Sequence, residues 1–221
     1  MLRADPYSAH QWVIRQCRGA REVLDVGGSA GTIARELRGG ATAVDIIEID
    51  AQAAAVAQAV GRQVLAGDVE TMPLPLELAA YDAIILADLI EHLRDPIATM
   101  ARLRPYLAPA GRLLITTPNI ANWSMRLLHL AGRWDYTDRG IMDRTHLRFF
   151  TRRTLLAAIR AAGYRVVDVD VTCPLPALRR EPLIHRPKQW ADRASSQPGP
   201  EGLPSTGPPI PAHAFRRWGE P

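Results

Sequence analysis

The sequence predicts an α/β fold built on a doubly wound, mostly parallel sheet. Short apolar segments alternate with helix-forming segments from Glu22 to Val171, which is the pattern of a parallel sheet with helices on both faces. The first apolar segment leads directly into a turn with three glycines, "VLDVGGSAG" at 23–31. Glycines after a strand let the backbone approach a ligand closely, and several adenosine-bearing cofactors favour such turns.

The first half of the chain contains three predicted strands and three predicted helices. Trp12 lies in the first helix and is expected to cover one end of the domain. Gly39-Gly40 and Gly61 provide C-terminal stops for the other two helices. The expected order is a helix at 7–18, a strand at 22–26, a helix at 30–38, a strand at 43–49, a helix at 50–60 and a strand at 63–67.

The second half continues the alternation around one long insertion. The apolar segment 81–87 predicts a buried strand, and Asp95-Pro96 supplies a helix cap followed by proline at the first helical position. Pro109 to Gly111 predicts a turn, whereas 118–150 is long for a connection, which is typical of functional insertions. The remaining expected elements are a helix at 97–107, a strand at 112–117, a helix at 152–163 and a strand at 164–171.

These elements divide the chain of 221 residues into three parts. Residues 1–20 are expected to form a helical cap and 21–173 the folded domain, with 118–150 as a lid over the substrate. Residues 174–221 hold eleven of the 18 prolines. Such a composition cannot build a hydrophobic core, so this tail is expected to be disordered from about Pro187.

Composition argues against several classes of protein. No apolar run approaches the roughly 20 residues of a membrane helix, and the start, "MLRADPYSAHQW", lacks the apolar segment of a signal peptide. We therefore expect a cytoplasmic protein without a membrane span. Cys17 and Cys173 have no metal-ligand spacing and are expected to be free thiols. The net charge of +4 arises mostly from scattered arginines, with Lys188 the only lysine, which argues against nucleic acid as a partner.

The glycine turn does not fit a dinucleotide site. The pattern G-x-G-x-x-G needs glycines where this chain has Gly27, Ser29 and Thr32. The pattern G-x-G-x-G instead meets Gly27, Ser29 and Gly31, and this loop resembles that of class I S-adenosylmethionine (SAM) methyltransferases. The stretch "YDAIILADLIEHLRDP" also resembles the segment "FD-x-apolar…LEH-x-x-DP" of that family. The resemblance spans about 20–172 and implies a Rossmann-like fold with SAM as cofactor.

Acidic residues follow the predicted strands in the order that such a site needs. Glu48 lies at the end of the second strand, where a carboxylate can accept hydrogen bonds from both ribose hydroxyls, and Asp50 is the alternative. Asp68 follows the third strand and suits the exocyclic amine of adenine. The resemblance implies a cofactor site made of Asp25, Gly27, Ser29, Gly31, Glu48, Asp68, Val69 and Asp88.

Two features depart from the family pattern. Ser29 replaces the middle glycine, so a positive φ at this position would cost about 1 kcal/mol, while its hydroxyl becomes available to the cofactor. The family's sheet usually ends in an antiparallel hairpin, and no convincing strand follows 164–171. The sheet is therefore expected to lack its last antiparallel strand.

Two histidines are candidates for the chemistry on the acceptor. A hydroxyl acceptor must lose its proton, which calls for a general base or a metal ion. His92 follows the fourth strand, and His146 lies in "DRTHLRFFT" within the lid. As a metal-free base, His146 would be kept neutral by Arg144 and Arg148, whose charges lower its pKa.

The alternative is a divalent metal site. Asp88, Glu91 and His92 are spaced i, i+3 and i+4 and share one face if the turn is helical. With His146 they form an oxygen and nitrogen ligand set suited to magnesium or manganese. This set and the stretch "TPN…HLRFFT" resemble the small-RNA terminal 2′-O-methyltransferases, whereas "LEH" also occurs in relatives whose histidine is structural.

The lid leaves several roles open. Trp123 and Trp134 either contact a polar ring of the acceptor or anchor the lid. Arg152 and Arg153, like Arg144 and Arg148, either receive a phosphate or carboxylate of the acceptor or are solvated.

The segment that includes the lid resembles bacterial methyltransferases of sugar, lipid-linked glycan or secondary-metabolite pathways. We therefore expect O-methylation of a small-molecule polar acceptor. A quinone-type O-methyltransferase and a metal-dependent RNA 2′-O-methyltransferase are the enzymatic alternatives. An NAD(P)-dependent oxidoreductase and a non-catalytic SAM-binding protein are the alternatives from other classes.

Overall fold

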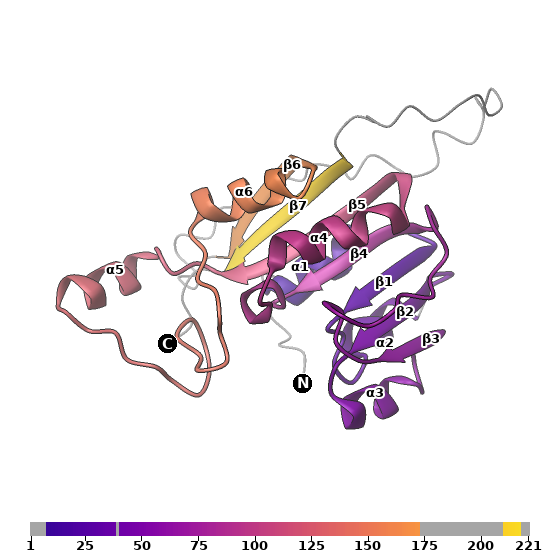
Figure 1. The fold of residues 1–221 in the computed structure, drawn as a ribbon, viewed down its shortest axis with the longest axis horizontal. Coiled ribbons are helices and arrows are strands. Elements are labelled where there is room, and N and C mark those ends of the chain that lie inside the picture. The colour runs from indigo at the N-terminus through magenta and orange to yellow at the C-terminus, as the bar shows by residue number, and fades with distance from the viewer. Residues whose placement is uncertain (1–7, 39, 173–209, 218–221) are drawn as a thin grey trace.

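The protein is built around a seven-stranded sheet with the strand order β3-β2-β1-β4-β5-β7-β6 (Figure 1). The computed structural model describes residues 8–38, 40–172 and 210–217. All strand pairs in these ranges are parallel, so the predicted fold class is confirmed. The strands are β1 (Glu22–Val26), β2 (Ala43–Glu48), β3 (Gln63–Ala66), β4 (Tyr81–Ala87), β5 (Leu107–Pro118), β6 (Tyr164–Thr172) and β7 (Ile210–Arg217).

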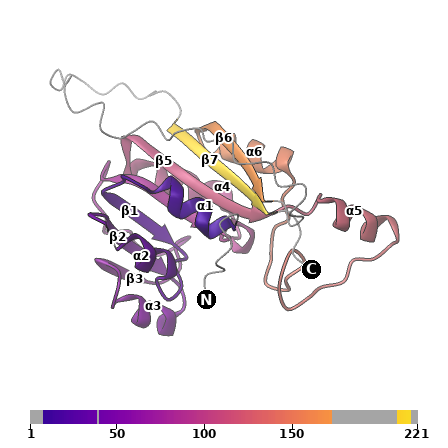
Figure 2. The same cartoon turned by 180° about the vertical axis from the view of Figure 1, so that it is seen from behind.

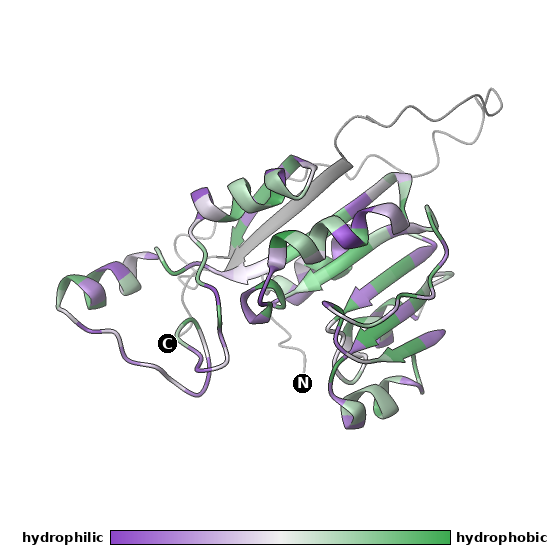
Figure 3. Cartoon of the chain, in the orientation of Figure 1, coloured by the Kyte–Doolittle hydropathy of each residue, from purple (hydrophilic) through white to green (hydrophobic). Residues whose placement is uncertain are grey.

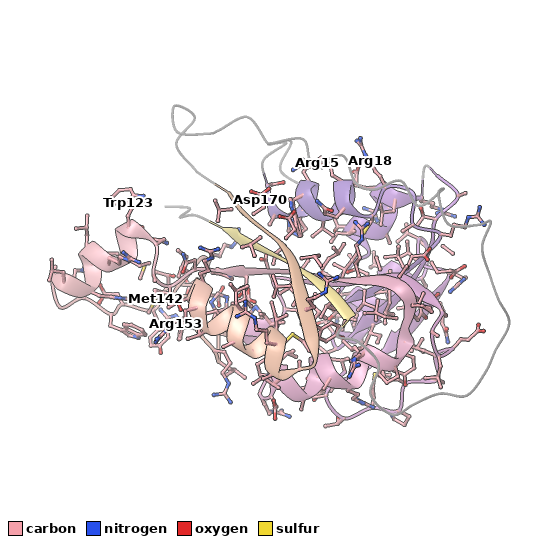
Figure 4. The ribbon with its side chains drawn as sticks, turned by 90° about the horizontal axis from the view of Figure 1, so that it is seen from above. Arg15, Arg18, Trp123, Met142, Arg153 and Asp170 are labelled. Atoms are coloured by element: carbon pink, nitrogen blue, oxygen red, sulfur yellow. The ribbon has the colours of Figure 1, made fainter. Side chains whose placement is uncertain are left out.

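Helices cover both faces of this sheet (Figure 2). Figure 4 shows α1 (Ala9–Gln16), marked by Arg15, on the opposite side of the sheet from α6 (Arg152–Ala161). Within the described part of the chain, no helix has the length and apolar character needed to cross a membrane. The helices are α1 (Ala9–Gln16), α2 (Thr32–Leu37), α3 (Ala51–Ala57), α4 (Pro96–Leu103), α5 (Trp123–Leu130) and α6 (Arg152–Ala161), with the short 3₁₀ helices η1 (Ile90–His92) and η2 (Arg104–Tyr106).

The central strands are apolar because both of their faces are buried. On β4, Ile84 and Leu86 belong to the core beneath α4 and α6, whereas Ala83 and Ile85 belong to the core beneath α1 and α2. Figure 3 shows apolar residues running along β4. This two-sided burial explains why the sequence shows a continuous apolar run here instead of an alternating pattern.

Side-chain caps begin five of the described helices, α3, α4 and α6 among them. Asp50 accepts hydrogen bonds from the backbone of Gln52 and Ala53 at the start of α3. Asp95 accepts one from Ala98, and Pro96 is the first residue of α4. Thr151 caps α6. The predicted cap at Asp95 is therefore confirmed.

The predicted turn at 109–111 is wrong. β5 runs continuously from Leu107 to Pro118, and its pairing with β4 shifts register between Tyr81 and Ala83. A Cβ atom on Gly111 would lie 2.6 Å from the carbonyl oxygen of Tyr81. Gly111 thus permits the close approach of two strands at an irregularity in their pairing. In the sequence, such a glycine looks the same as the glycine of a turn.

The prediction of a disordered tail is wrong for residues 210–217. They form β7, which lies between β5 and β6 and pairs in parallel with both. A strand in this position gives hydrogen-bond partners to two strand edges that would otherwise be open. The expectation that no further strand follows 164–171 is therefore wrong, and the strand that β7 adds is parallel. The rest of the predicted tail, 174–209 and 218–221, and residues 1–7 of the predicted cap lie outside the described residues.

A buried carboxylate ties three strands together. Asp45 Oδ2 accepts hydrogen bonds from the Tyr81 hydroxyl at 2.7 Å and from Arg62 Nη2 at 2.6 Å. Arg62 Nε donates to the other oxygen of Asp45 at 2.9 Å, and its Nη1 lies 2.6 Å from Glu22 Oε2. Burial and the hydrogen bond to Asp45 raise the pKa of Tyr81.

The substitution Arg62→Ala should lower the free energy of unfolding by about 2 kcal/mol, because the buried Asp45 carboxylate loses its charge-assisted hydrogen bonds from the half-exposed Arg62. Urea denaturation measures this change. Arg35→Ala is the control, since Arg35 is exposed on α2, and such surface changes stay within about 0.5 kcal/mol. Equal losses in both variants would show that the network does not stabilise the sheet.

Candidate functional site

A cavity of about 390 Å³ opens at the carboxyl edge of the sheet. Ligands of doubly wound folds bind at this edge, and the volume lies within the range of about 300–1,000 Å³ that is usual for small-molecule sites. We name it the cofactor cavity. Of the predicted cofactor residues it brings together Gly27, Glu48, Asp68, Val69 and Asp88.

The glycine turn borders this cavity in a conformation that only glycine adopts without strain. Gly27 and Gly31 have φ of 72° and 73°. A Cβ atom on Gly27 would lie 2.9 Å from Leu89, and one on Gly31 would lie 2.4 Å from Val60. Ser29 has φ of 49°, so the strain expected for a serine here is present, at a cost of about 1 kcal/mol.

The carboxylate of Glu48 connects the glycine turn to the end of β2. Its Oε2 accepts a hydrogen bond from the backbone N–H of Ser29 at 2.7 Å, and its Oε1 accepts one from Asp50 at 2.9 Å. Glu48 is buried, whereas Asp50 is exposed and caps α3. The geometry therefore distinguishes the two acids that the sequence left as alternatives.

Asp25 lies beneath the glycine turn and does not line the cofactor cavity. It is 1% exposed, and a Cβ atom on Gly28 would lie 2.9 Å from its Oδ2. Among the described residues, that oxygen has no hydrogen-bond partner. Burial, together with the charge of Glu48, raises the pKa of Asp25 to about 7.

Asp68 and Val69 form the far wall of the cofactor cavity. Asp68 Oδ1 accepts a hydrogen bond from the backbone of Glu70 at 2.8 Å, and its Oδ2 lies 3.6 Å from Arg94 Nη1. The carbonyl of Val69 accepts a hydrogen bond from Arg102. This wall is therefore held in place by two segments: the residue that follows it, Glu70, and helix α4 through Arg102.

Asp88 lies where the cofactor cavity meets a second, smaller cavity. Its φ is 51°, a left-handed conformation that costs energy in a residue other than glycine. Its backbone N–H donates to Thr116 Oγ1 at 2.9 Å, and its Oδ1 accepts from the same hydroxyl at 2.8 Å. A threonine at the end of β5 thus holds Asp88 in its strained conformation.

The second cavity has a volume of about 180 Å³ and is covered by the lid. We name it the acceptor cavity. Asp88 and His92 line both cavities, so the two spaces adjoin. The remaining wall includes Glu91 and, from the lid, Gly140, Ile141, Asp143 and His146.

His92 and His146 face each other across the acceptor cavity. Their ring centroids lie 4.8 Å apart in an edge-on arrangement. His146 Nδ1 is 3.0 Å from the carbonyl oxygen of Ile141, and His92 Nδ1 is 3.2 Å from that of Thr145. A carbonyl can only accept, so Nδ1 of each ring carries a proton, which leaves Nε2 of the neutral ring as an acceptor.

The pKa of His146 is lowered, but the predicted reason is wrong. Burial is the main cause, and the neighbouring His92 adds to it. Arg144 pairs with Asp138 at 3.0 Å, and Arg148 donates to the carbonyl of Arg94 at 2.6 Å. Sequence neighbours in an extended lid point in different directions, so the two arginines do not act on His146.

Three of the four candidate metal ligands come together. The ligand atoms of Glu91, His92 and His146 all lie within 4.8 Å of one another. Asp88 is not part of this group, because its left-handed backbone precedes η1 and takes it off the face that Glu91 and His92 occupy. The predicted i, i+3, i+4 face is therefore wrong for Asp88.

The lid is fastened to η1 by backbone hydrogen bonds, and aromatic contacts hold the lid together internally. The backbone N–H groups of Leu147 and Arg148 donate to the carbonyl of Glu91 at 2.8 and 2.9 Å. Trp134 stacks on His129 with a centroid distance of 4.6 Å and meets the edge of Phe149. Trp134 therefore packs against other residues of the lid.

Two threonines at the end of β5 were missed in the sequence. Thr116 holds Asp88, and Thr117 Oγ1 donates to Glu91 Oε2 at 3.0 Å. Both are buried. The available signal was a pair of polar residues at the carboxyl end of an otherwise apolar strand, which is the edge where ligands bind.

The raised pKa of Asp25 predicts a measurable pH dependence of stability. The folded protein retains a proton that the unfolded chain releases from about pH 4 upward, so this group lowers stability as the pH rises towards 7. The Asp25→Asn variant lacks this proton. As the pH rises from 5 to 7, the free energy of unfolding of Asp25→Asn minus that of the parent should therefore increase by about 1 kcal/mol per pH unit. Chemical denaturation at several pH values measures the two slopes. Asp138→Asn, at an exposed acid of the lid, should leave the slope unchanged. Parallel curves for parent and Asp25→Asn would contradict the prediction.

Comparison with known proteins relates this arrangement to methyltransferases. Residues 4–169 match a family described as a methyltransferase domain. A ubiquinone biosynthesis O-methyltransferase of Xylella fastidiosa (strain M23) is 33% identical over 181 residues, covering 78% of this chain and 70% of the relative. A tRNA U34 carboxymethyltransferase of Methylococcus capsulatus is 32% identical over 121 residues, covering 52% of this chain and 37% of that longer protein.

Solved structures support the same fold. A SAM-dependent methyltransferase of Archaeoglobus fulgidus superimposes with a TM-score of 0.54 at 17% identity, covering 71% of this chain and 69% of the other. One from Thermotoga maritima gives a TM-score of 0.51 at 19% identity, covering 72% of this chain and 75% of the other. The family match spans most of the folded domain and favours a methyltransferase over the alternative of an NAD(P)-dependent oxidoreductase. The chain belongs to the SAM-dependent methyltransferases with the class I, Rossmann-like fold.

Proposed function

We propose that this enzyme methylates a hydroxyl oxygen of a small polar acceptor of the sugar, lipid-linked glycan or secondary-metabolite class. The supporting observation is that the cofactor cavity and the acceptor cavity adjoin at Asp88 and His92. One cavity is bordered by carboxylates at strand ends, and the other contains His146, an imidazole with a lowered pKa. A cofactor site beside a proton acceptor is what O-methylation requires.

The cofactor cavity suits SAM in its size and its polar groups. Each carboxylate oxygen of Glu48 accepts one backbone hydrogen bond and keeps a lone pair for a ribose hydroxyl. In this proposal, Asp68 and Val69 hold the adenine end and Asp88 lies beside the methionine end, while Asp25 supports the glycine turn from below. SAM supplies a methyl group on a positively charged sulfur, which is already a good leaving group.

On the acceptor side, His146 is the proposed general base. Its Nδ1–H donates to Ile141, so Nε2 takes the proton of the acceptor hydroxyl as the oxygen is methylated. The lowered pKa keeps the imidazole neutral at pH 7, as a base must be. His92, held by Thr145 against His146, positions this ring. The lid excludes water from the acceptor cavity.

The Xylella relative is named as an O-methyltransferase, which supports oxygen as the methylated atom and keeps a quinone-type acceptor as a variant of the proposal. A metal-dependent reaction is the second candidate, as in RNA 2′-O-methylation. The approach of Glu91, His92 and His146 supports it, because a divalent ion held there would lower the pKa of the acceptor hydroxyl in place of a base.

Glu48→Ala should weaken the binding of SAM and of its demethylated product at least tenfold in calorimetry, since the ribose loses its acceptor. Glu48→Gln, which keeps one acceptor oxygen, should lie between this variant and the parent. Glu36→Ala removes an exposed acid of α2 and should bind like the parent. Thermal unfolding verifies that each variant is folded. If the parent takes up neither ligand, or if folded Glu48→Ala binds like the parent, the proposed cofactor site is wrong.

The acceptor can be identified by incubating the protein with methyl-labelled SAM and a host extract. Mass spectrometry of the labelled product then shows which compound is methylated. With that acceptor, His146→Ala should reduce kcat at least a hundredfold, and the parent rate should rise with pH through the lowered pKa of His146. If His146 acts as the base, EDTA should leave the methylation rate unchanged. Loss of activity with EDTA and its recovery with manganese would favour the metal-dependent mechanism. Unchanged turnover in His146→Ala, in His92→Ala and with EDTA would exclude both.

A further inference from the structure

A third hollow, of about 630 Å³, lies between α5 and α6. It is separate from the two cavities described above, with which it shares no lining residue. We call it the arginine groove. It is lined chiefly by Asn119, Trp123, Arg126, Thr151, Arg152 and Arg153.

Among the described residues, the positive charge of the arginine groove is uncompensated. Arg126, Arg152 and Arg153 line it, and none of the described lining residues is acidic. None of the three forms a hydrogen bond or an ion pair through its guanidinium group with any described residue. Other arginines do have such partners, as in the pair of Arg133 with Asp135. Three unpaired guanidinium groups around one hollow form a site for an anion.

The two helices reinforce this charge. α5 and α6 both begin at the groove, with Trp123 and Arg152 as their first residues. A helix N-terminus carries a partial positive charge and backbone N–H groups that point outward. The two N-termini therefore add to the attraction for a negatively charged group.

The aromatic and amide groups indicate more than a bare ion. Trp123, which is 51% exposed, lines the groove, and its indole offers a flat apolar surface. Asn119 is buried, and its Oδ1 accepts a hydrogen bond from Ala121 at 3.1 Å. A phosphate group bonded to an organic moiety matches this mixture of guanidinium groups, an aromatic ring and a fixed amide.

The groove lies next to the acceptor cavity along the chain. Pro118 lines the acceptor cavity and Asn119 lines the groove, and consecutive Cα atoms are about 3.8 Å apart. The backbone N–H of Ile120 donates to the carbonyl of Phe150 at 3.0 Å, which fixes this strand end beside the start of α6. Figure 4 shows Trp123 on α5 and Arg153 on α6 at the same end of the molecule as Met142 of the lid.

We propose that the arginine groove binds a phosphate or diphosphate group of the acceptor while the acceptor's hydroxyl lies near His146. That this phosphate belongs to the methyl acceptor rests on the proposed function, but phosphate binding can be measured without methyl transfer. A soluble sugar nucleotide and a lipid-linked sugar phosphate both carry this chemistry. Trp123 contacts the organic part next to the phosphate.

Calorimetry with uridine diphosphate and with inorganic pyrophosphate tests the groove in the full chain. The double variant Arg152→Ala/Arg153→Ala should bind both at least tenfold more weakly than the parent. The control, Arg35→Ala/Arg165→Ala, removes the same charge from exposed residues outside the groove and should bind like the parent. Trp123→Ala should weaken uridine diphosphate more than pyrophosphate, because only the former offers a ring.

Flotation with phosphatidylglycerol vesicles, compared with phosphatidylcholine vesicles, tests the lipid source of the phosphate. Arginine-dependent binding of uridine diphosphate supports a soluble acceptor, and arginine-dependent binding of phosphatidylglycerol alone supports a lipid-linked one. Absence of binding to every phosphate probe, or equal losses in the groove variant and the control, would overturn the inference.

Calorimetry with SAM on the same samples separates this inference from the proposed function. SAM binding without phosphate binding would refute only the arginine groove. Arginine-dependent phosphate binding in a protein that does not bind SAM would refute only the proposed function.

Discussion

The contact between Glu48 and the backbone of Ser29 is the interaction on which the cofactor cavity depends. It joins the end of β2 to the glycine turn after β1, and the same carboxylate accepts from Asp50, where α3 begins. Two strand ends and a helix start are therefore fixed by one buried side chain. Parallel strands make this possible, because their carboxyl ends meet at one edge and bring residues far apart in sequence within hydrogen-bond distance.

Several energetic costs are concentrated around that edge. Ser29 and Asp88 have left-handed backbone conformations, and the buried Asp25 has an oxygen without a partner in the described structure. A sheet selected for stability alone would avoid all three. They persist because the surrounding contacts hold them, through Glu48 for Ser29 and through Thr116 for Asp88, and strained residues held in this way are typical of functional sites.

The acceptor side is assembled differently, from the lid and η1. The carbonyl of Glu91 receives two backbone hydrogen bonds from the lid, and the rings of His92 and His146 meet in a T-shaped contact. The earlier part of the lid contains α5, which projects from the body of the protein (Figures 1 and 2). On α5, only Met125 is buried. The lid is thus fixed where it covers the acceptor cavity and open where it borders the arginine groove.

The sequence by itself determined the alternation of strands and helices, the glycine turn and the order of the acids, because these depend on local propensity, on hydrophobic period and on the fact that parallel strands end at one edge. It also indicated Glu48, which the structure places in the cofactor cavity. Contacts between distant segments decided the rest. The predicted turn at 109–111 became part of a strand where Gly111 meets Tyr81, β7 entered between β5 and β6, and Asp88 left the face shared by Glu91 and His92. The environment of His146 likewise depended on burial under the lid and on His92, and not on the arginines next to it in sequence, because a side chain's surroundings are set by packing in three dimensions.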